Sequence, residues 1–167
     1  MVNMQSPLPI DARPEFRKWL NQWPFSRYVT LAFNQPVGHF LLESNRLRMR
    51  ERLRKWDAMM NSKILGRNWA KKPEDHMFTF YVLEKPNSNP HYHGLIRFFE
   101  GGGLPVASQE ERLDKHADRI WKHLVPSGST SIQAIYDQAG ASKYLAKTLA
   151  NAVSWDNLVL PDEFKRH

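Results

Sequence analysis

The sequence predicts a single domain of the α+β class, built around a β-hairpin in the middle of the chain. Its 167 residues are enough for one domain with a hydrophobic core and too few for two of ordinary size. Aromatic and β-branched residues fill two runs, 78–84 and 91–99, on either side of a cluster of turn-forming residues at 85–90. This pattern is typical of a hairpin with a moderately long loop. Apolar residues at helical spacing in other segments predict the helices of the fold.

The elements before the hairpin are predicted from the same patterns. A short helix at 12–22 has Asp11 as its N-cap and ends before Pro24. A buried strand at 28–33 follows, and the pattern then becomes helical from about 40 to 63.

After the hairpin, a second long helix is expected to open at Ser108, where Glu111 completes a capping box. A further strand is predicted at 131–136, and a helix that contains residues 143–149 follows it. The apolar residues of the tail, from Trp155 onward, are expected to pack back onto the domain or onto a part that is not present here.

Three side chains of the hairpin are candidate metal ligands. Side chains alternate along a strand, so His91 and His93 share one face, and Glu84 ends the facing strand level with them. Two imidazoles and one carboxylate suit magnesium, manganese or zinc. The alternative is that the two histidines are only polar residues at the surface of a sheet.

The composition excludes several classes of protein. The chain has no cysteine, which excludes disulfides, thiolate zinc sites and cysteine nucleophiles and is consistent with a reducing compartment. It shows neither a membrane-spanning run nor a signal peptide, so we expect a cytoplasmic protein without a membrane partner. No Walker motif is present, so no ATP-driven helicase activity is expected.

The charge points to a polyanionic partner. A net charge of +7 and a pI near 9.8 favour nucleic acid first. The densest basic run lies on the first long helix and includes Arg46, Arg50 and Arg54, and Lys71 and Lys72 follow in the next loop. These five residues are candidate phosphate contacts, and a solvated helix face explains them equally well.

Tyr144 and Lys147 stand three residues apart and share one face of the predicted helix. A phenol has a pKa near 10 and is a weak nucleophile at neutral pH. It becomes effective when a metal polarises the electrophile and a cation stabilises the developing charge. A phosphodiester held at Glu84, His91 and His93 would be such an electrophile, and Tyr144 would then form a phosphotyrosine ester.

Together these segments resemble the motifs of the HUH endonucleases, and among them the single-tyrosine replication initiators of rolling-circle plasmids, phages and small single-stranded DNA viruses. A strand of Phe-Thr-Leu type followed by a polar turn is matched by residues 28–36, and Tyr-x-x-Lys is matched by Tyr144 and Lys147. The two histidines flanking a hydrophobic residue are matched by His91-Tyr92-His93, with Glu84 in the place of the acidic ligand. The resemblance covers roughly residues 25–150.

The order of these motifs favours the replication initiators within the superfamily. The tyrosine comes last in the chain, whereas conjugative relaxases carry it near the N-terminus. Thr148 stands four residues after the tyrosine, where single-tyrosine transposases often have a glutamine ligand.

The resemblance implies a five-stranded antiparallel sheet flanked by helices, an RRM-like or ferredoxin-like core, spanning one domain with additions at both ends. It implies Mn²⁺ or Mg²⁺ at Glu84, His91 and His93, and Tyr144 as the nucleophile. Lys147 would orient the phosphate or the attacking group.

The implied reaction is site-specific nicking of single-stranded DNA at an origin or hairpin. It leaves a free 3′-hydroxyl and a 5′-phosphotyrosine link, and strand rejoining follows. The DNA would lie across the sheet, with Arg97 and Thr30 among its contacts. A host helicase or a missing segment would unwind the duplex, in the bacterial cytoplasm for a plasmid or phage and in the nucleus for a eukaryotic virus.

Three alternatives remain open. A single-tyrosine transposase of the same superfamily would act on hairpin-flanked element ends. A non-catalytic RRM-like domain that binds single-stranded nucleic acid would show no metal dependence and no covalent adduct. A metal-dependent nuclease that uses water would keep cleaving after Tyr144→Phe.

Overall fold

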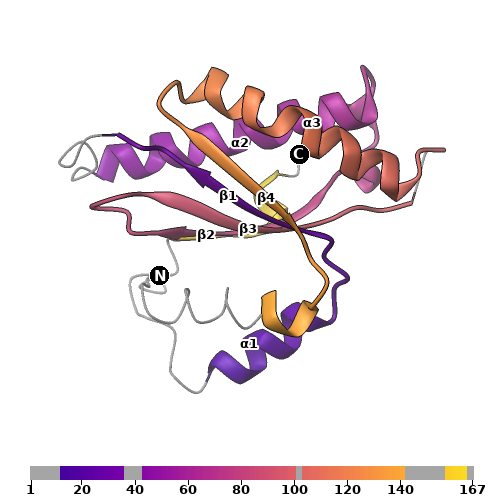
Figure 1. Cartoon of the computed structure of the whole chain (residues 1–167), viewed down its shortest axis with the longest axis horizontal. Helices are drawn as coiled ribbons and strands as arrows, with labels where there is room; N and C mark the ends of the chain where they lie inside the picture. Colours follow the sequence, from indigo (N-terminus) through magenta and orange to yellow (C-terminus); the bar gives the residue numbers. More distant parts are fainter. Residues whose placement is uncertain (1–11, 36–42, 101–102, 142–156, 165–167) are drawn as a thin grey trace.

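The computed structural model describes residues 12–35, 43–100, 103–141 and 157–164 (Figure 1). Five strands form one antiparallel sheet in the order β4-β1-β3-β2-β5, which confirms the predicted α+β class with a five-stranded antiparallel sheet and flanking helices. The strands are β1 (Arg27–Ala32), β2 (Phe78–Glu84), β3 (His91–Arg97), β4 (Ser129–Ala134) and β5 (Leu158–Val159).

Helices cover the two faces of the sheet unequally. The two long helices, α2 (Glu43–Leu65) and α3 (Val106–Leu124), lie side by side over one face, and the short helix α1 (Ala12–Asn21) lies on the other (Figure 1). The described residues also include the short 3₁₀ helices η1 (Trp69–Lys71), η2 (Pro73–Asp75) and η4 (Pro161–Phe164).

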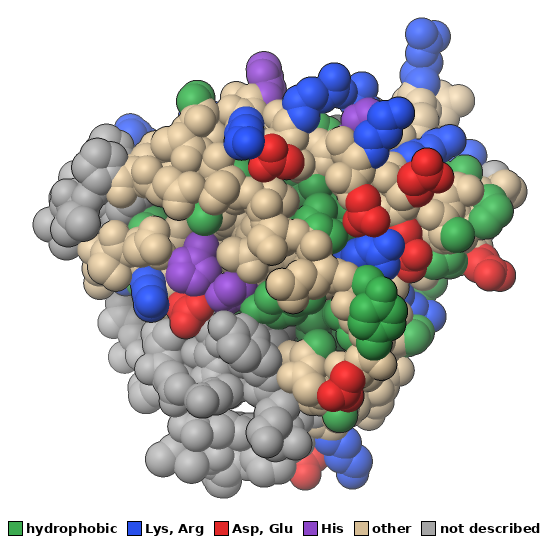
Figure 2. All heavy atoms as spheres, in the orientation of Figure 1, with side chains coloured by type: hydrophobic (Ala, Val, Ile, Leu, Met, Phe, Trp, Pro, Cys, Tyr) green, Lys and Arg blue, Asp and Glu red, His purple; other side chains and the backbone are tan. Residues whose placement is uncertain are grey.

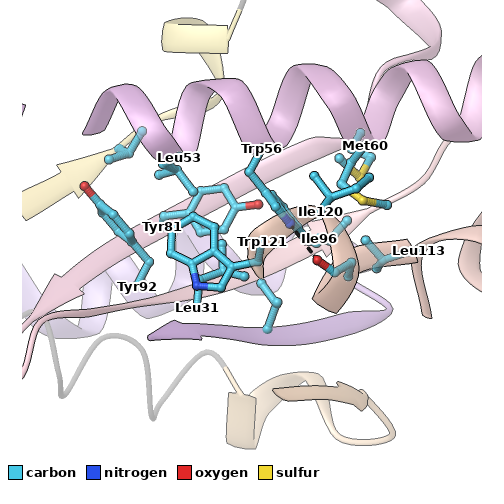
Figure 3. Packing of buried hydrophobic residues seen from close by; sticks show 14 of the residues in the cluster. Leu31, Leu53, Trp56, Met60, Tyr81, Tyr92, Ile96, Leu113, Ile120 and Trp121 are labelled. Atoms are coloured by element: carbon cyan, nitrogen blue, oxygen red, sulfur yellow. Dashed lines mark hydrogen bonds between the residues drawn. The ribbon is translucent and has the colours of Figure 1, made fainter. Parts of the chain in front are cut away.

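The main hydrophobic core lies between the sheet and the α2–α3 pair (Figure 3). Trp56 of α2 is fully buried there, and its indole N–H donates a hydrogen bond of 3.1 Å to the Ala117 carbonyl of α3. The sheet contributes Tyr81 and Tyr92, which are also buried and meet edge to face at 6.4 Å. Because alternate residues of a strand face opposite sides, the placement of Tyr92 in this core turns its two histidine neighbours to the other face.

That other face has a smaller apolar cluster beneath α1. Leu20 of α1 is buried against Phe80 and Leu95 of the central strands, and Trp19 meets the ring of Phe80 edge to face. Thr30, His91 and His93 are on this same face, and the buried Val82 of the cluster pairs directly with His93.

Gly94 permits a close approach between the two central strands. It lies directly opposite Tyr81, and a Cβ atom at position 94 would lie 2.4 Å from two carbons of the Tyr81 ring. The absence of a side chain at Gly94 thus makes room for the tyrosine ring in the main core, next to the His91–His93 pair.

Three predicted boundaries were wrong by a few residues. The second long helix starts at Val106 and has Pro105 as its N-cap without a side-chain hydrogen bond, so the capping box expected at Ser108 and Glu111 does not form the start of the helix. The strand predicted at 131–136 is β4, two residues earlier. The strand predicted at 91–99 ends at Arg97.

The C-terminal part contributes the fifth strand, which packs back onto the domain as the tail was expected to do. Leu158 and Val159 pair with β2, and the ring of Phe164 meets the ring of Tyr81 at 5.8 Å. Arg50 of α2 forms an ion pair with Glu163 and donates a hydrogen bond to the Leu158 carbonyl. In the described segments, no helix is long and apolar enough to cross a lipid bilayer.

Candidate metal centre

Glu84, His91 and His93 converge at one end of the hairpin, as the sequence predicted. The antiparallel register pairs Glu84 directly with His91. The Nε2 atoms of both histidines lie 2.8 Å from the same atom, Oε2 of Glu84, and the potential ligand atoms all lie within 4.8 Å of one another. The group is thus arranged to hold a metal ion, and Figure 2 shows histidine side chains beside an acidic one on this side of the molecule.

The surroundings of His91 show that its Nε2 atom is suited to a cation. The Nδ1 atom lies 2.7 Å from the Asn89 backbone carbonyl, which can only accept a hydrogen bond, so Nδ1 carries a proton. In a neutral imidazole the lone pair is then on Nε2, and it points at a carboxylate oxygen of Glu84. Two such groups approach to 2.8 Å only with a proton or a metal ion to bridge them, which is the chemistry of a ligand pair.

His93 is held from two sides. Its Nδ1 atom lies 3.0 Å from the Thr30 hydroxyl on β1, the residue paired with it across the strands. Its ring also stacks on the ring of Tyr28, at a centroid distance of 5.5 Å and an interplanar angle of 25°. Contacts of this kind fix the orientation of a ligating imidazole and leave Nε2 directed at the metal position.

The protonation states favour metal binding. Partial burial disfavours the ionised carboxyl of Glu84, but hydrogen bonds from His91 and His93 outweigh it and hold its pKa below the ordinary value. Burial, together with the charge of His91, lowers the pKa of His93. A carboxylate and a neutral imidazole are the forms that coordinate a divalent ion.

A pocket of about 570 Å³ adjoins the metal centre on the same face of the sheet. His93 and Thr30 form part of its wall, so the pocket and the centre share a residue. The rest of the wall is Tyr28, Gln133, Ala134, Ile135, Tyr136, Asp137 and Ala141. Its volume is in the range of small-molecule sites, about 300–1,000 Å³.

Thr30 and Arg97 were both expected to contact DNA, and the structure places them differently. Thr30 lies at the metal centre, through its contact with His93. Arg97 is on the same face but six residues along β3 from His91, about 20 Å away. Its guanidinium lies over the rings of Trp23 and Phe99, at 5.5 and 4.4 Å from their centroids.

The basic residues of the first long helix lie across the sheet from the metal centre, because α2 covers the opposite face (Figure 1). Arg50 and Arg54 both pair with Glu163, which ties α2 to η4. Arg46 is on the same helix, and Lys71 and Lys72 follow it, at the end of η1 and just after it. Contact of these five residues with DNA stays a prediction, and the structure brings none of them to the centre.

Tyr144 and Lys147 lie outside the described residues, so their predicted helix and roles stay predictions. The other four tyrosines of the chain divide into two groups. Tyr81 and Tyr92 are buried in the main core, and burial raises the pKa of both phenols. Tyr28 and Tyr136 line the pocket beside the metal centre.

Two functional contacts were missed from the sequence. Tyr28 was treated only as the first residue of a strand, although it shares strand parity with Thr30 and lies on the same face. Because Thr30 pairs with His93, this alternation would have placed Tyr28 on the face of the metal centre. The Asn89 carbonyl belongs to an irregular turn, and no pattern in the sequence predicts its direction.

No protein-family model matches the sequence, and the search of curated proteins gave no match. The search of solved structures found the crystal structure of the hypothetical protein ORF119 from Sulfolobus islandicus rod-shaped virus 1, with 16% sequence identity and a TM-score of 0.39. The match covers 84% of this chain and 96% of that one. A likeness at this level carries no argument about function.

Proposed function

We propose that this protein is a metal-dependent endonuclease and strand transferase of the HUH type. It nicks single-stranded DNA at a specific site through a covalent 5′-phosphotyrosine intermediate, and it initiates rolling-circle replication of a plasmid, phage or virus. Glu84, His91 and His93 hold the ion, Mn²⁺ or Mg²⁺, and Tyr144 is the nucleophile.

The observation that carries the proposal is the shared oxygen of Glu84. Two imidazole Nε2 atoms lie at 2.8 Å from it, and the other nitrogen of each ring is engaged by Asn89 or Thr30. Three protein ligands at one end of a sheet leave the remaining coordination positions for substrate and water, as metal sites for phosphoryl chemistry require.

When bound, the ion supplies Lewis acidity that polarises a phosphoryl oxygen. The phenol oxygen of Tyr144 attacks phosphorus, and the bond from phosphorus to the 3′-oxygen breaks. The phenol proton is released and the 3′-oxygen leaves as a hydroxyl, so the strand gains a free 3′ end. Lys147 stabilises the negative charge that develops on the phosphate.

The path of the chain supports Tyr144 as the nucleophile. Ala141 lines the pocket that His93 also lines, and Tyr144 follows Ala141 by three residues in the sequence. Three residues of chain span at most about 11 Å. Tyr144 is therefore close in the sequence to a residue of this pocket.

The proposal is tested with a pool of single-stranded oligonucleotides and manganese, analysed on a denaturing gel. We expect a slower-migrating protein band that disappears with chelator, with Glu84→Gln and with Tyr144→Phe. The matched control is Tyr81→Phe, which removes only a hydroxyl from a residue of the main core on the opposite face of the sheet, and which should retain the band.

Other outcomes separate the alternatives. Cleavage that survives Tyr144→Phe without an adduct indicates a nuclease that uses water. Tight DNA binding with a metal ion bound, but no adduct on any oligonucleotide, including hairpins, indicates a non-catalytic binding domain. Preference for transposon-like hairpin ends over replication origins would favour the transposase.

A further inference from the structure

Tyr136 is an unusual surface residue. It follows β4, and its side chain is 96% exposed, the most exposed large hydrophobic residue in the described part of the chain. A single exposed apolar residue is ordinary at a protein surface, so Tyr136 is of interest because of where its ring stands. Tyr136 stands in the wall of the pocket beside the metal centre.

The strand register explains the rest of the pocket. Tyr28 on β1 is paired with Gln133 on β4. Thr30, the next residue of β1 on the same face, is paired with His93 on β3. The pocket therefore runs from the metal ligand His93 outward across β1 to the edge strand β4. A molecule that reaches from the metal centre along this row meets the tyrosine rings and then the amide of Gln133.

The chemistry of the wall suits a neutral aromatic group. The described residues that line the pocket include no lysine or arginine. Its one carboxylate, on Asp137, is turned toward Gly140: a Cβ atom there would lie 2.6 Å from Asp137 Oδ2. The wall otherwise presents two phenol rings, an isoleucine, and an amide that both donates and accepts hydrogen bonds.

We propose that this pocket binds a nucleobase of the single-stranded DNA, next to the phosphate held at the metal centre. Tyr136 stacks on the base, and Gln133 hydrogen-bonds its edge. The inference rests on the proposed function for its substrate class, and it assigns Tyr136 a binding role and no chemical one. Stacking of a base on an aromatic ring is the usual means by which proteins hold single strands.

The test measures binding without cleavage. Fluorescence anisotropy with labelled single strands of dT, dC and dA, about twelve nucleotides long, is recorded in the presence of chelator. We expect Tyr136→Ala to weaken binding of at least one homopolymer by about five- to hundredfold, which is the effect of losing one stacking interaction between a base and an aromatic ring. Tyr136→Phe should bind as the wild type does, because it keeps the ring.

The matched control is Leu47→Ala. Leu47 is also an exposed large hydrophobic residue, 68% exposed, but it lies on α2 across the sheet. Its substitution should leave affinity unchanged. A second set of probes carries a single abasic site, moved to each position of the strand in turn. At one position the missing base should weaken binding by the wild type and leave binding by Tyr136→Ala unchanged.

The two proposals fail in different ways. If Tyr136→Ala binds every strand as tightly as the wild type, or if the wild type binds none of them, the base pocket is overturned, even where the adduct with manganese forms. If Tyr136→Ala weakens binding but no adduct forms, the pocket is supported and nicking is overturned. Loss of the adduct in Tyr136→Phe would make the Tyr136 hydroxyl the nucleophile and overturn the role assigned here.

Discussion

His91 and His93 differ from surface histidines in what holds their second nitrogen. A turn carbonyl fixes His91 and a strand hydroxyl fixes His93, so both rings present Nε2 to Glu84. The contact from Thr30 is the more easily tested, because a hydroxyl can be removed without changing the shape of the side chain.

We predict that Thr30→Val lowers the affinity for Mn²⁺ by about 10- to 100-fold, the usual effect of removing a group that orients a ligand. Valine keeps the β-branched shape and leaves His93 Nδ1 without its partner. Isothermal titration calorimetry measures the affinity. Thr130→Val is the control, since Thr130 pairs with Leu31 and faces the helices. An equal decrease of affinity in both variants would refute the positioning role of Thr30.

At the scale of elements, the hairpin must carry the metal ligands on one face and fill the core with the other. Gly94 follows His93 directly and lies under the ring of Tyr81. The missing side chain at position 94 thus leaves the space in the main core that the Tyr81 ring fills.

Gly94→Ala is expected to destabilise the fold by about 1–3 kcal/mol, the usual cost of overpacking. The added carbon would lie 2.4 Å from the Tyr81 ring, well inside normal contact. Urea unfolding gives the change in stability. Combining it with Tyr81→Leu should restore part of the stability, because leucine lacks the clashing ring atoms. If the double variant loses as much stability as the two single variants added together, this explanation is contradicted.

The contact between α2 and β2 includes a buried acid. The Asp57 carboxyl accepts a hydrogen bond of 2.9 Å from the Asn61 amide, and Asn61 in turn accepts one from the Met77 backbone N–H at the entry to β2. Burial raises the pKa of Asp57 to about 7, against the opposing effect of hydrogen bonds from Asn61 and Thr79.

This pKa predicts a pH-dependent stability. Between about pH 4 and 7 folded Asp57 keeps a proton that the unfolded chain has released, so the free energy of unfolding falls as the pH rises through this range. From pH 5 to pH 8 the stability of the wild type should fall by about 3 kcal/mol more than that of Asp57→Asn, which does not titrate. Urea unfolding of both proteins at the two pH values checks it. Parallel pH profiles would show that Asp57 is already ionised at pH 5.

Among the described residues, the basic side chains of α2 and the metal centre lie on opposite faces of the sheet. Lys and Arg side chains are numerous along the top of Figure 2, over the layer of helices, and two adjacent histidine side chains lie lower, beside an acidic one. Arg50 and Arg54 neutralise Glu163 in this layer.

This separation predicts a dependence on strand length. Lys71→Gln with Lys72→Gln should leave the affinity for strands of about twelve nucleotides unchanged, because such strands cover only the site face. For strands several times longer, the slope of log K against log salt should decrease by about 0.7 for each phosphate that the variant no longer neutralises. Anisotropy titrations over a range of salt concentrations measure both. Weaker binding of the short strands would place these lysines in the site itself.

The hairpin and its ligands could be predicted from the sequence because strand alternation is strict. Once the turn was located, it followed that His91 and His93 share one face and that Glu84 lies opposite them on the facing strand. The buried strands β1, β2 and β3 were predicted for the same reason, since continuous apolar and aromatic runs mark them.

The edges of the sheet were less predictable. Most β4 side chains are exposed, so its residues lack an alternating apolar pattern, and its position was predicted two residues too late. β5 has two residues, too few for any periodicity, and it forms only because Leu158 and Val159 meet β2. The pocket depends on the spatial order of β4 and β1, which are far apart in the chain, so Tyr136 was not recognised as a pocket residue.

The most direct single measurement is mass spectrometry of the metal-dependent adduct. The protein is incubated with single-stranded DNA and manganese, the DNA is trimmed with nuclease, and the peptides are sequenced to locate the remaining nucleotide. We predict a nucleotide attached through a phosphodiester to Tyr144. A nucleotide on any other residue, or unmodified Tyr144 in a protein that binds both manganese and DNA, would contradict the proposed mechanism.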